Sequence, residues 1–311
     1  MKTLPLLVAV MLLHSACRMS DVAAGMLVRE GRAELDAGRY ETAIRTLTKA
    51  IRMNPGYAIA YNDRGLARYY LRQYDSALMD FNAALERNPG LSAAYNNRGL
   101  VHDMRGEYKL ALADFGRARG LSPYDAAVLS NRGLTRYHLH DDDHALEDLE
   151  GALGLDSTYA RAYNNRGLVR LRRQEWMLAL ADFRAALAYE PGLLMSEVNL
   201  ANAFQQLGQY DSAVVHGRLG IGSHGGSAIA NNNLGMAFLS LGQYDSALAR
   251  FDTAVARDPT LVTALLNRAV AHQRAGHAAA ARRDYDAVIA MGKDPDLTAD
   301  ARTRLRQLKQ P

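Results

Sequence analysis

This chain of 311 residues has one cysteine, few long apolar stretches and only a small excess of positive charge. Its single cysteine, Cys17, excludes an intrachain disulfide. A net charge of +4 is too small to indicate nucleic-acid binding by itself. No stretch rich in proline, glycine and serine divides the chain into separate domains. Leucine, alanine and arginine are abundant instead, which favours helices over sheet.

The N-terminus has the features of an export signal. Lys2 precedes an apolar run of ten residues, Leu4–Leu13, which is too short to span a bilayer but suits the core of a signal peptide. Small residues then lead directly to Cys17. This arrangement resembles the bacterial lipobox, in which the cysteine receives lipid and becomes the mature N-terminus. His14 departs from the pattern, which has an aliphatic residue three positions before the cysteine.

The resemblance implies a signal peptide over residues 1–16 and a lipidated tether over residues 17–23. It also implies attachment to a membrane of the bacterial cell envelope. Arg18 is not the aspartate that retains lipoproteins of enteric bacteria in the inner membrane, so the outer membrane is favoured. Two alternatives stay open, namely simple secretion after ordinary cleavage and an uncleaved N-terminal anchor with a chance cysteine.

The remaining chain repeats itself with a period of 34 residues. The stretch AYNNRGLV stands at residues 94–101 and at residues 162–169, two periods (68 residues) apart. Eight consecutive repeats fit between residues 24 and 295 without an insertion. A period of this length is typical of solenoids built from stacked supersecondary units. The repeats begin at Ala24, Ala58, Ser92, Ala126, Ala160, Leu194, Ala228 and Val262.

Each repeat predicts two helices joined by a turn. Glycine fills position eight in six of the eight repeats, alanine fills position twenty in all of them, and position twenty-four is usually large. A glycine inside a helix costs about 1 kcal/mol relative to alanine, so its recurrence predicts a close approach of the partner helix. Proline at position thirty-two ends the second helix in five repeats. We therefore expect each repeat to form an antiparallel helix hairpin.

This spacing resembles that of the tetratricopeptide repeat (TPR) family, and the resemblance covers residues 24–295. It implies an all-α fold, a right-handed superhelical solenoid of eight TPR hairpins with a concave groove lined by the first helices. A stack of this kind needs a polar lid over its last apolar face. Residues 296–311 predict such a capping helix, with Leu297, Ala301, Leu305 and Leu308 along one side.

Arginine at position seven and aspartate at position twenty-three occur together in the same five repeats. An arginine cannot pair with position twenty-three of the preceding repeat, because Arg64 would then meet Thr46 and Arg268 would meet Arg250. We therefore expect structural ion pairs within each hairpin. Position eleven is arginine or histidine in these repeats, so each aspartate is expected to bridge two bases. The pairs are Arg64 with Asp80, Arg98 with Asp114, Arg132 with Asp148, Arg166 with Asp182, and Arg268 with Asp284.

A row of polar side chains at position six is the candidate binding site. Asparagine is unfavourable inside helices because its amide competes for backbone hydrogen bonds, so a row of asparagines indicates selection. Leucines at position nine and nearby tyrosines share the same helix face. The candidate groove residues are Asp63, Asn97, Asn131, Asn165, Asn199, Asn233, Asn267, Leu66, Leu100, Leu134, Leu168, Tyr69 and Tyr137.

The row resembles the asparagine ladder in the TPR groove of the protein O-linked N-acetylglucosamine transferase, where the amides hold the backbone of an extended peptide. Amides suit that task because each one can donate to a carbonyl group and accept from an N–H group. The alternative is that these amides bridge successive first helices and contact no ligand.

Two further segments depart from the repeat pattern. His138–His144 (HLHDDDH) falls at the turn of its hairpin, where Asp143 suits a helix N-cap, so a solvated turn is expected rather than a metal site. Gly217–Gly226 (GRLGIGSHGG) replaces two packing residues with Gly217 and Gly220 and predicts a frayed or bent second helix.

The expected function is that of a membrane-tethered scaffold that binds a protein partner or an extended peptide, as in the envelope TPR lipoproteins that the chain resembles. The alternative is a non-protein ligand, such as a glycan or an anionic lipid. We do not expect an enzyme, because the repeats occupy nearly all of the chain. No catalytic residue, cofactor, metal or nucleic-acid partner is assigned.

Overall fold

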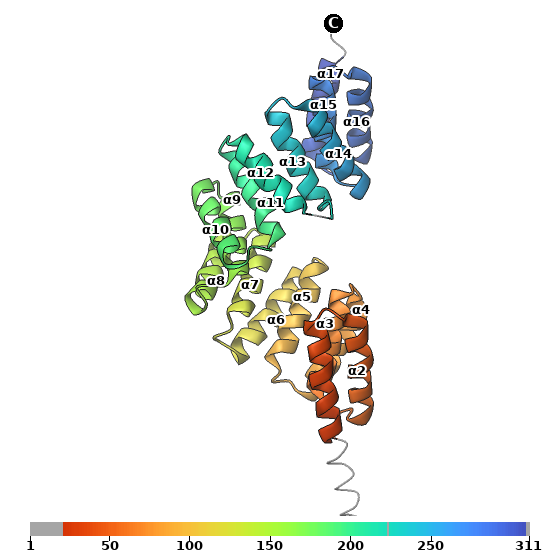
Figure 1. The fold of residues 1–311 in the computed structure, drawn as a ribbon, viewed down its shortest axis with the longest axis vertical. Coiled ribbons are helices and arrows are strands. Elements are labelled where there is room, and N and C mark those ends of the chain that lie inside the picture. The colour runs from red at the N-terminus through yellow and green to blue at the C-terminus, as the bar shows by residue number, and fades with distance from the viewer. Residues whose placement is uncertain (1–20, 223, 309–311) are drawn as a thin grey trace, which may run out of the picture. The chain divides into compact units, whose positions relative to one another are not determined.

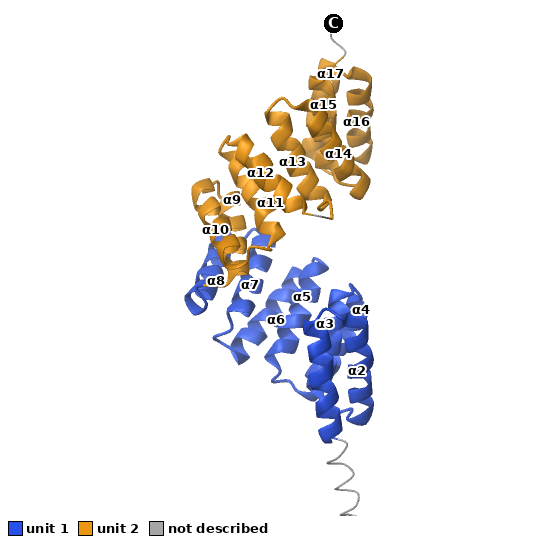
Figure 2. Ribbon diagram, in the orientation of Figure 1, with its two compact units in different colours: residues 1–157 blue, residues 158–311 orange. Residues whose placement is uncertain are grey.

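The computed structural model describes residues 21–222 and 224–308, and every regular element within these ranges is a helix (Figure 1). The chain divides into two compact units, residues 1–157 and residues 158–311 (Figure 2). Within each unit the helices follow one another as hairpin pairs. The expected all-α fold of consecutive helix hairpins is therefore confirmed. Cys17 and the signal segment lie outside the described residues.

The N-terminal unit contains repeats 1 to 4. Its first helix is described over residues 21–36. The first helices of repeats 2 to 4 begin at the first residue of each repeat. The helices of this unit that follow are α2 (Tyr40–Met53), α3 (Ala58–Tyr70), α4 (Tyr74–Arg87), α5 (Ser92–Met104), α6 (Tyr108–Leu121), α7 (Ala126–His138) and α8 (Asp142–Leu155).

The C-terminal unit contains repeats 5 to 8 and the last helix. Here too the first helix of each repeat begins where the repeat begins. The helices are α9 (Ala160–Arg172), α10 (Trp176–Tyr189), α11 (Leu194–Gln206), α12 (Tyr210–Ile221), α13 (Ala228–Ser240), α14 (Tyr244–Arg257), α15 (Val262–Arg274), α16 (Ala278–Met291) and α17 (Pro295–Gln307).

The glycine at position eight packs directly against the large side chain at position twenty-four of the same hairpin. A Cβ atom at Gly99 would lie 2.8 Å from Cε1 of Phe115, and one at Gly167 would lie 2.5 Å from Cε1 of Phe183. Both phenylalanines are fully buried. The recurring glycine therefore makes room for an aromatic ring, which explains why the sequence tolerates its low helix propensity.

The five ion pairs expected from the sequence are all present within their hairpins. In four of them the arginine Nη2 atom lies 2.6 to 2.8 Å from an aspartate oxygen, and Arg132 pairs with Asp148 in the same way. The Nε atom donates a second hydrogen bond to the same carboxylate, as from Arg98 to Asp114 at 2.8 Å. Donation to Asp114 raises the pKa of Arg98, against the lowering effect of burial. Bidentate pairs of this kind fix both distance and orientation.

The third nitrogen of three of these arginines reaches the preceding hairpin, a contact that the sequence did not predict. Nη1 of Arg98 donates to Oδ1 of Asn82 at 2.7 Å, and Nη1 of Arg268 donates to Asp252 at 2.9 Å. Nη1 of Arg64 donates to Thr48 at 3.1 Å. The acceptors all lie at position twenty-five of the preceding repeat. One guanidinium group therefore joins two helices of its own hairpin and also one helix of the previous hairpin.

The bridge from position eleven forms with arginine but not with histidine. Arg68, Arg136 and Arg170 each lie 2.7 to 2.8 Å from the aspartate of their hairpin. Nδ1 of His102 instead lies 2.6 Å from Glu107, and its Nε2 lies 3.8 Å from Asp114, beyond hydrogen-bond distance. His272 contacts His277, and burial lowers its pKa although Asp284 acts in the opposite direction.

The glycine-rich segment of repeat 6 shortens its second helix. α12 has 12 residues, whereas α10 and α14 have 14, and it ends before Gly222, whose φ of 52° is in the left-handed region. Gly217 and Gly220 themselves are buried inside the helix. A Cβ atom at Gly220 would lie 2.6 Å from Cγ2 of Val198. Close packing, rather than bending, therefore accounts for Gly220.

The last helix, α17, covers the apolar end of the C-terminal unit as the sequence predicted. Asp294 caps it by accepting hydrogen bonds from the backbone N–H groups of Asp296 and Leu297 at 2.9 and 3.0 Å. Ala301 is fully buried in the last core cluster, and Leu297, Leu305 and Leu308 pack against that cluster. Among the described residues, no helix is long and apolar enough to cross a membrane.

A double-mutant cycle tests the ion pair of repeat 3. Arg98→Ala should lower the free energy of unfolding by about 3 kcal/mol, because it leaves the buried Asp114 uncompensated. Asp114→Ala should cost less, because Arg98 is only half-buried. The double variant should lose at least 1 kcal/mol less than the sum, roughly the coupling expected of residues in contact. Arg304 and Asp300 form an exposed pair at 2.9 Å and are the control, with an expected coupling below about 1 kcal/mol. Equal coupling in the two cycles would contradict the structural role of the buried pair.

Candidate functional site: the amide face of the first helices

The position-six residues lie in the middle of the first helices. Asp63 is 2% exposed, Asn97, Asn165 and Asn199 are each 9% exposed, and the other three asparagines are half-buried. We call the surface formed by positions two, five, six and nine of the first helices the amide face. Its residues are described separately for each unit.

The amide at position six donates to the asparagine at position five of the preceding repeat. Nδ2 of Asn97 donates to Oδ1 of Asn62 at 3.1 Å. The same bond runs from Asn131 to Asn96, from Asn199 to Asn164 and from Asn267 to Asn232, at 2.9 to 3.0 Å. These amides therefore bridge successive first helices, as the alternative expectation proposed.

A second set of bonds links the two neighbouring amides within repeats 3, 5 and 7. Nδ2 of the position-five asparagine donates to Oδ1 of its neighbour at position six, at 3.3 to 3.5 Å in three repeats. The two sets alternate, so Asn131, Asn96, Asn97 and Asn62 form a relay in which each amide donates to the next, from repeat 4 to repeat 2. Mutual polarisation strengthens such a chain.

Asp63 ends this relay in the N-terminal unit. It accepts a hydrogen bond from Nδ2 of Asn62 at 3.0 Å, and no asparagine precedes it because position five of repeat 1 is Val28. A carboxylate is suited to this place because it only accepts hydrogen bonds. Nε and Nη2 of Arg32 pair with its two oxygens at 3.0 and 2.8 Å, which neutralises the buried charge. The aspartate that interrupts the row in the sequence is thus the last acceptor.

The relay is interrupted in the C-terminal unit at Val198, which occupies position five of repeat 6. Asn233 then has no amide oxygen to which it could donate, and Asn199 has no neighbouring amide from which to accept. Within the described parts of the chain, no hydrogen bond involves Nδ2 of Asn233 or Oδ1 of Asn199. An open donor and an open acceptor therefore lie on α13 and α11, two helices that contact each other.

Exposed apolar side chains flank these two open groups. Met195 and Ile229 occupy position two of repeats 6 and 7, one helical turn before Asn199 and Asn233. Their exposed fractions are 54% and 57%. This part of the amide face therefore combines unused amide hydrogen-bonding capacity with apolar surface.

The other predicted groove residues serve the core at least in part. Leu66, Leu100, Leu134 and Leu168 are half-buried, and Leu66, Leu100 and Leu168 pack against core clusters. Tyr69 packs edge-on against Tyr70, with ring centres 5.6 Å apart, and Tyr137 packs in the same way on His138.

The histidine-rich turn holds its side chains apart. His144 lies 2.7 Å from Asp141, whereas His138 stacks on Tyr108 with ring centres 5.2 Å apart. No group of three histidine, cysteine, aspartate or glutamate side chains in the described residues could hold a metal ion.

Family models agree with the hairpin geometry. A model of the tetratricopeptide repeat matches residues 62–126 and 232–298, and a second TPR model matches residues 31–71. The chain is a TPR protein. TPR proteins are generally non-catalytic scaffolds that bind protein or peptide partners. No curated protein matches the sequence.

Solved structures share the fold. The structure of the APC/C hetero-tetramer Cut9–Hcn1 is similar with a TM-score of 0.71 and 17% identity, covering 78% of this chain and 48% of that one. The present chain therefore spans about half the length of the chain that it matches in the Cut9–Hcn1 structure. A tetratricopeptide repeat protein from Parabacteroides merdae gives a TM-score of 0.61 at 17% identity, covering 80% of this chain and 98% of that one. PilF of Pseudomonas aeruginosa gives a TM-score of 0.56 at 21% identity, covering 67% of this chain and 94% of that one.

Proposed function

We propose that this TPR protein is a membrane-tethered scaffold that binds an extended segment of a partner protein on its amide face. The site of binding is centred on Asn199 and Asn233. The interruption of the amide relay at Val198 is the observation that carries this proposal. It leaves Nδ2 of Asn233 and Oδ1 of Asn199 open on neighbouring helices, whereas Nδ2 of Asn97, Asn131, Asn199 and Asn267 donates to the preceding repeat.

The two open groups match the backbone of an extended peptide. A peptide unit offers one carbonyl acceptor and one N–H donor, and it would accept from Nδ2 of Asn233 and donate to Oδ1 of Asn199. Contacts of this type hold the main chain irrespective of its sequence. Met195 and Ile229 would add selectivity by packing against alternate side chains of the same segment.

The membrane tether is proposed from the sequence around Cys17. The short apolar segment before it and the small residues next to it match a lipoprotein signal. Lipid on Cys17 would hold the TPR array beside a membrane of the bacterial envelope, with the outer membrane favoured by Arg18. In that place the scaffold would gather partner proteins at the membrane surface.

Removing the open amide should weaken peptide binding without unfolding the protein. Peptides that bind the full-length protein are first selected from a displayed peptide library. The Kd of each selected peptide is then measured by calorimetry. Asn233→Ala should raise Kd about fivefold, the effect of losing one hydrogen bond worth about 1 kcal/mol. Its thermal midpoint should fall only slightly, because the one bond lost within the protein is the 3.3 Å bond from Asn232, and alanine is the better helix former.

Asn97→Ala is the matched control, since both its amide nitrogen and its amide oxygen are engaged in the relay. It should lower the unfolding free energy by about 1–2 kcal/mol, because Asn62 and Asn96 lose their partners, and it should leave Kd unchanged. If Asn97→Ala weakens the peptide as much as Asn233→Ala does, the row is structural and the proposed site is wrong.

The tether has its own test in a bacterium that processes lipoproteins. Cys17→Ser removes the only thiol, so the protein should move from the membrane fraction to the soluble phase of a detergent partition. Ser20→Ala, three residues further on, should remain with the membrane. A Cys17→Ser variant that stays membrane-bound would contradict lipid attachment while leaving the peptide site untouched.

A further inference from the structure

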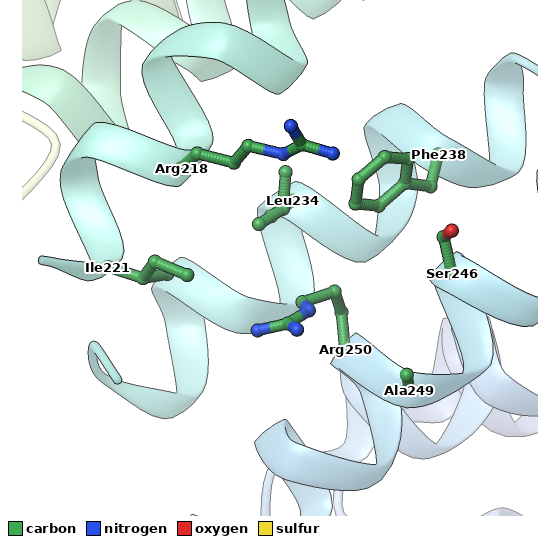
Figure 3. Close-up of a pocket in the computed structure, with 7 residues that line it drawn as sticks. All are labelled: Arg218, Ile221, Leu234, Phe238, Ser246, Ala249 and Arg250. Atoms are coloured by element: carbon green, nitrogen blue, oxygen red, sulfur yellow. The ribbon is translucent and has the colours of Figure 1, made fainter. Parts of the chain in front are cut away.

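A pocket of 410 Å³ lies between α12, α13 and α14 of the C-terminal unit (Figure 3). Arg218 and Ile221 line it from α12, Leu234 and Phe238 from α13, and Ser246, Ala249 and Arg250 from α14. None of these residues belongs to the amide face. Figure 3 shows the two arginine side chains entering from different helices, with Leu234 between them. The pocket therefore combines two cationic groups with an apolar floor.

The pocket occupies a place where the repeat pattern is reversed. In five repeats position seven is an arginine that pairs with an aspartate at position twenty-three. In repeat 7 these positions hold Leu234 and Arg250 instead. The register that carries a buried carboxylate elsewhere thus carries a guanidinium group here, and the acid is missing.

Neither arginine of the pocket pairs with an acidic side chain of residues 21–222 or 224–308. Arg218 lies over the ring of Phe238 at 5.6 Å, and Arg250 makes no ion pair or hydrogen bond with any described residue. Arg184 occupies the same register one repeat earlier and lies over Phe204 at the same distance of 5.6 Å. There, however, position twenty-three is His216, which hydrogen-bonds to Glu197 at 2.7 Å. Repeat 6 supplies its own acid, and repeat 7 does not.

We propose that this pocket binds a carboxylate that carries an apolar group of about the size of a leucine side chain. Guanidinium groups bind carboxylates through paired hydrogen bonds, and the Ser246 hydroxyl is placed to donate another. Ile221, Leu234 and Phe238 would enclose the apolar group. The volume lies near the lower end of the range for small-ligand sites, roughly 300–1,000 Å³. The carboxyl terminus of a partner protein and a free acylated amino acid both offer this chemistry.

The test uses N-acetyl-L-leucine and its uncharged counterpart N-acetyl-L-leucinamide as probes of the full-length protein. Binding is followed by NMR of the Ile221 methyl group in the pocket, with Ile59 in the N-terminal unit as an internal reference. The acid should shift the Ile221 signal in a saturable manner, and the amide should not. A pocket that binds both probes equally, or neither, overturns the proposal.

Matched variants assign the effect to the two arginines. Arg218→Ala and Arg250→Ala should each weaken N-acetyl-L-leucine at least tenfold with an unchanged thermal midpoint, since neither side chain pairs with an acid. Arg184→Ala removes an arginine of the same register and should have no effect. Equal losses from Arg184→Ala and Arg218→Ala would contradict the site.

A third arm distinguishes the source of the carboxylate. A hexapeptide that ends in leucine with a free carboxylate is compared with N-acetyl-L-leucine on the same Ile221 signal. Tighter binding of the peptide assigns the pocket to a protein terminus, and equal binding assigns it to the free acid. A peptide that shifts no Ile221 signal excludes the protein terminus and leaves the free acid as the ligand.

Discussion

The hydrogen bond from the position-six amide nitrogen to the side-chain oxygen of the position-five asparagine of the preceding repeat links successive first helices. A buried amide without a partner costs free energy, so the two asparagines fix the register in which one repeat stacks on the next. Because every amide donates in the same direction, the relay needs an acceptor at its end, and Asp63 supplies it with Arg32 as counter-charge. The same constraint makes any interruption of the relay conspicuous, since an interruption leaves polar groups open.

Departures from the repeat rules gather in repeats 6 and 7. Val198 replaces the position-five asparagine, and Gly220, which lies close to it, replaces the usual alanine at position twenty-seven. Leu234 and Arg250 stand where five other repeats have the ion pair. The loss of the position-five asparagine opens the amide face, and the loss of the ion pair leaves two arginines beside an apolar pocket. Local violations of a pattern that most of the chain follows are expected at functional sites. Both proposed sites lie in the C-terminal unit for this reason.

The exact period let the sequence predict much of the fold. The first helices from α3 onward begin at the predicted repeat starts, and the five arginine–aspartate pairs follow from residues that vary together from repeat to repeat. Bridging of successive first helices by the amides was one of two alternatives, but the partners at position five were not predicted, because each bond joins residues 35 positions apart in different repeats. The pocket escaped it too, because Arg250 is informative only once Arg218 is known to face the same space.

Restoring the relay is the most direct test that its interruption creates the peptide site. Val198→Asn restores the position-five asparagine found in repeats 2, 3, 5 and 7, and Gly220 is kept because a Cβ atom there would lie 3.0 Å from the backbone nitrogen of residue 198. The relay would then run through repeat 6 and engage both Asn199 and Asn233. Calorimetry with peptides selected on the unaltered protein should show at least fivefold weaker binding, about 1 kcal/mol, together with a higher thermal midpoint. Unchanged peptide affinity in a stabilised variant would contradict the account.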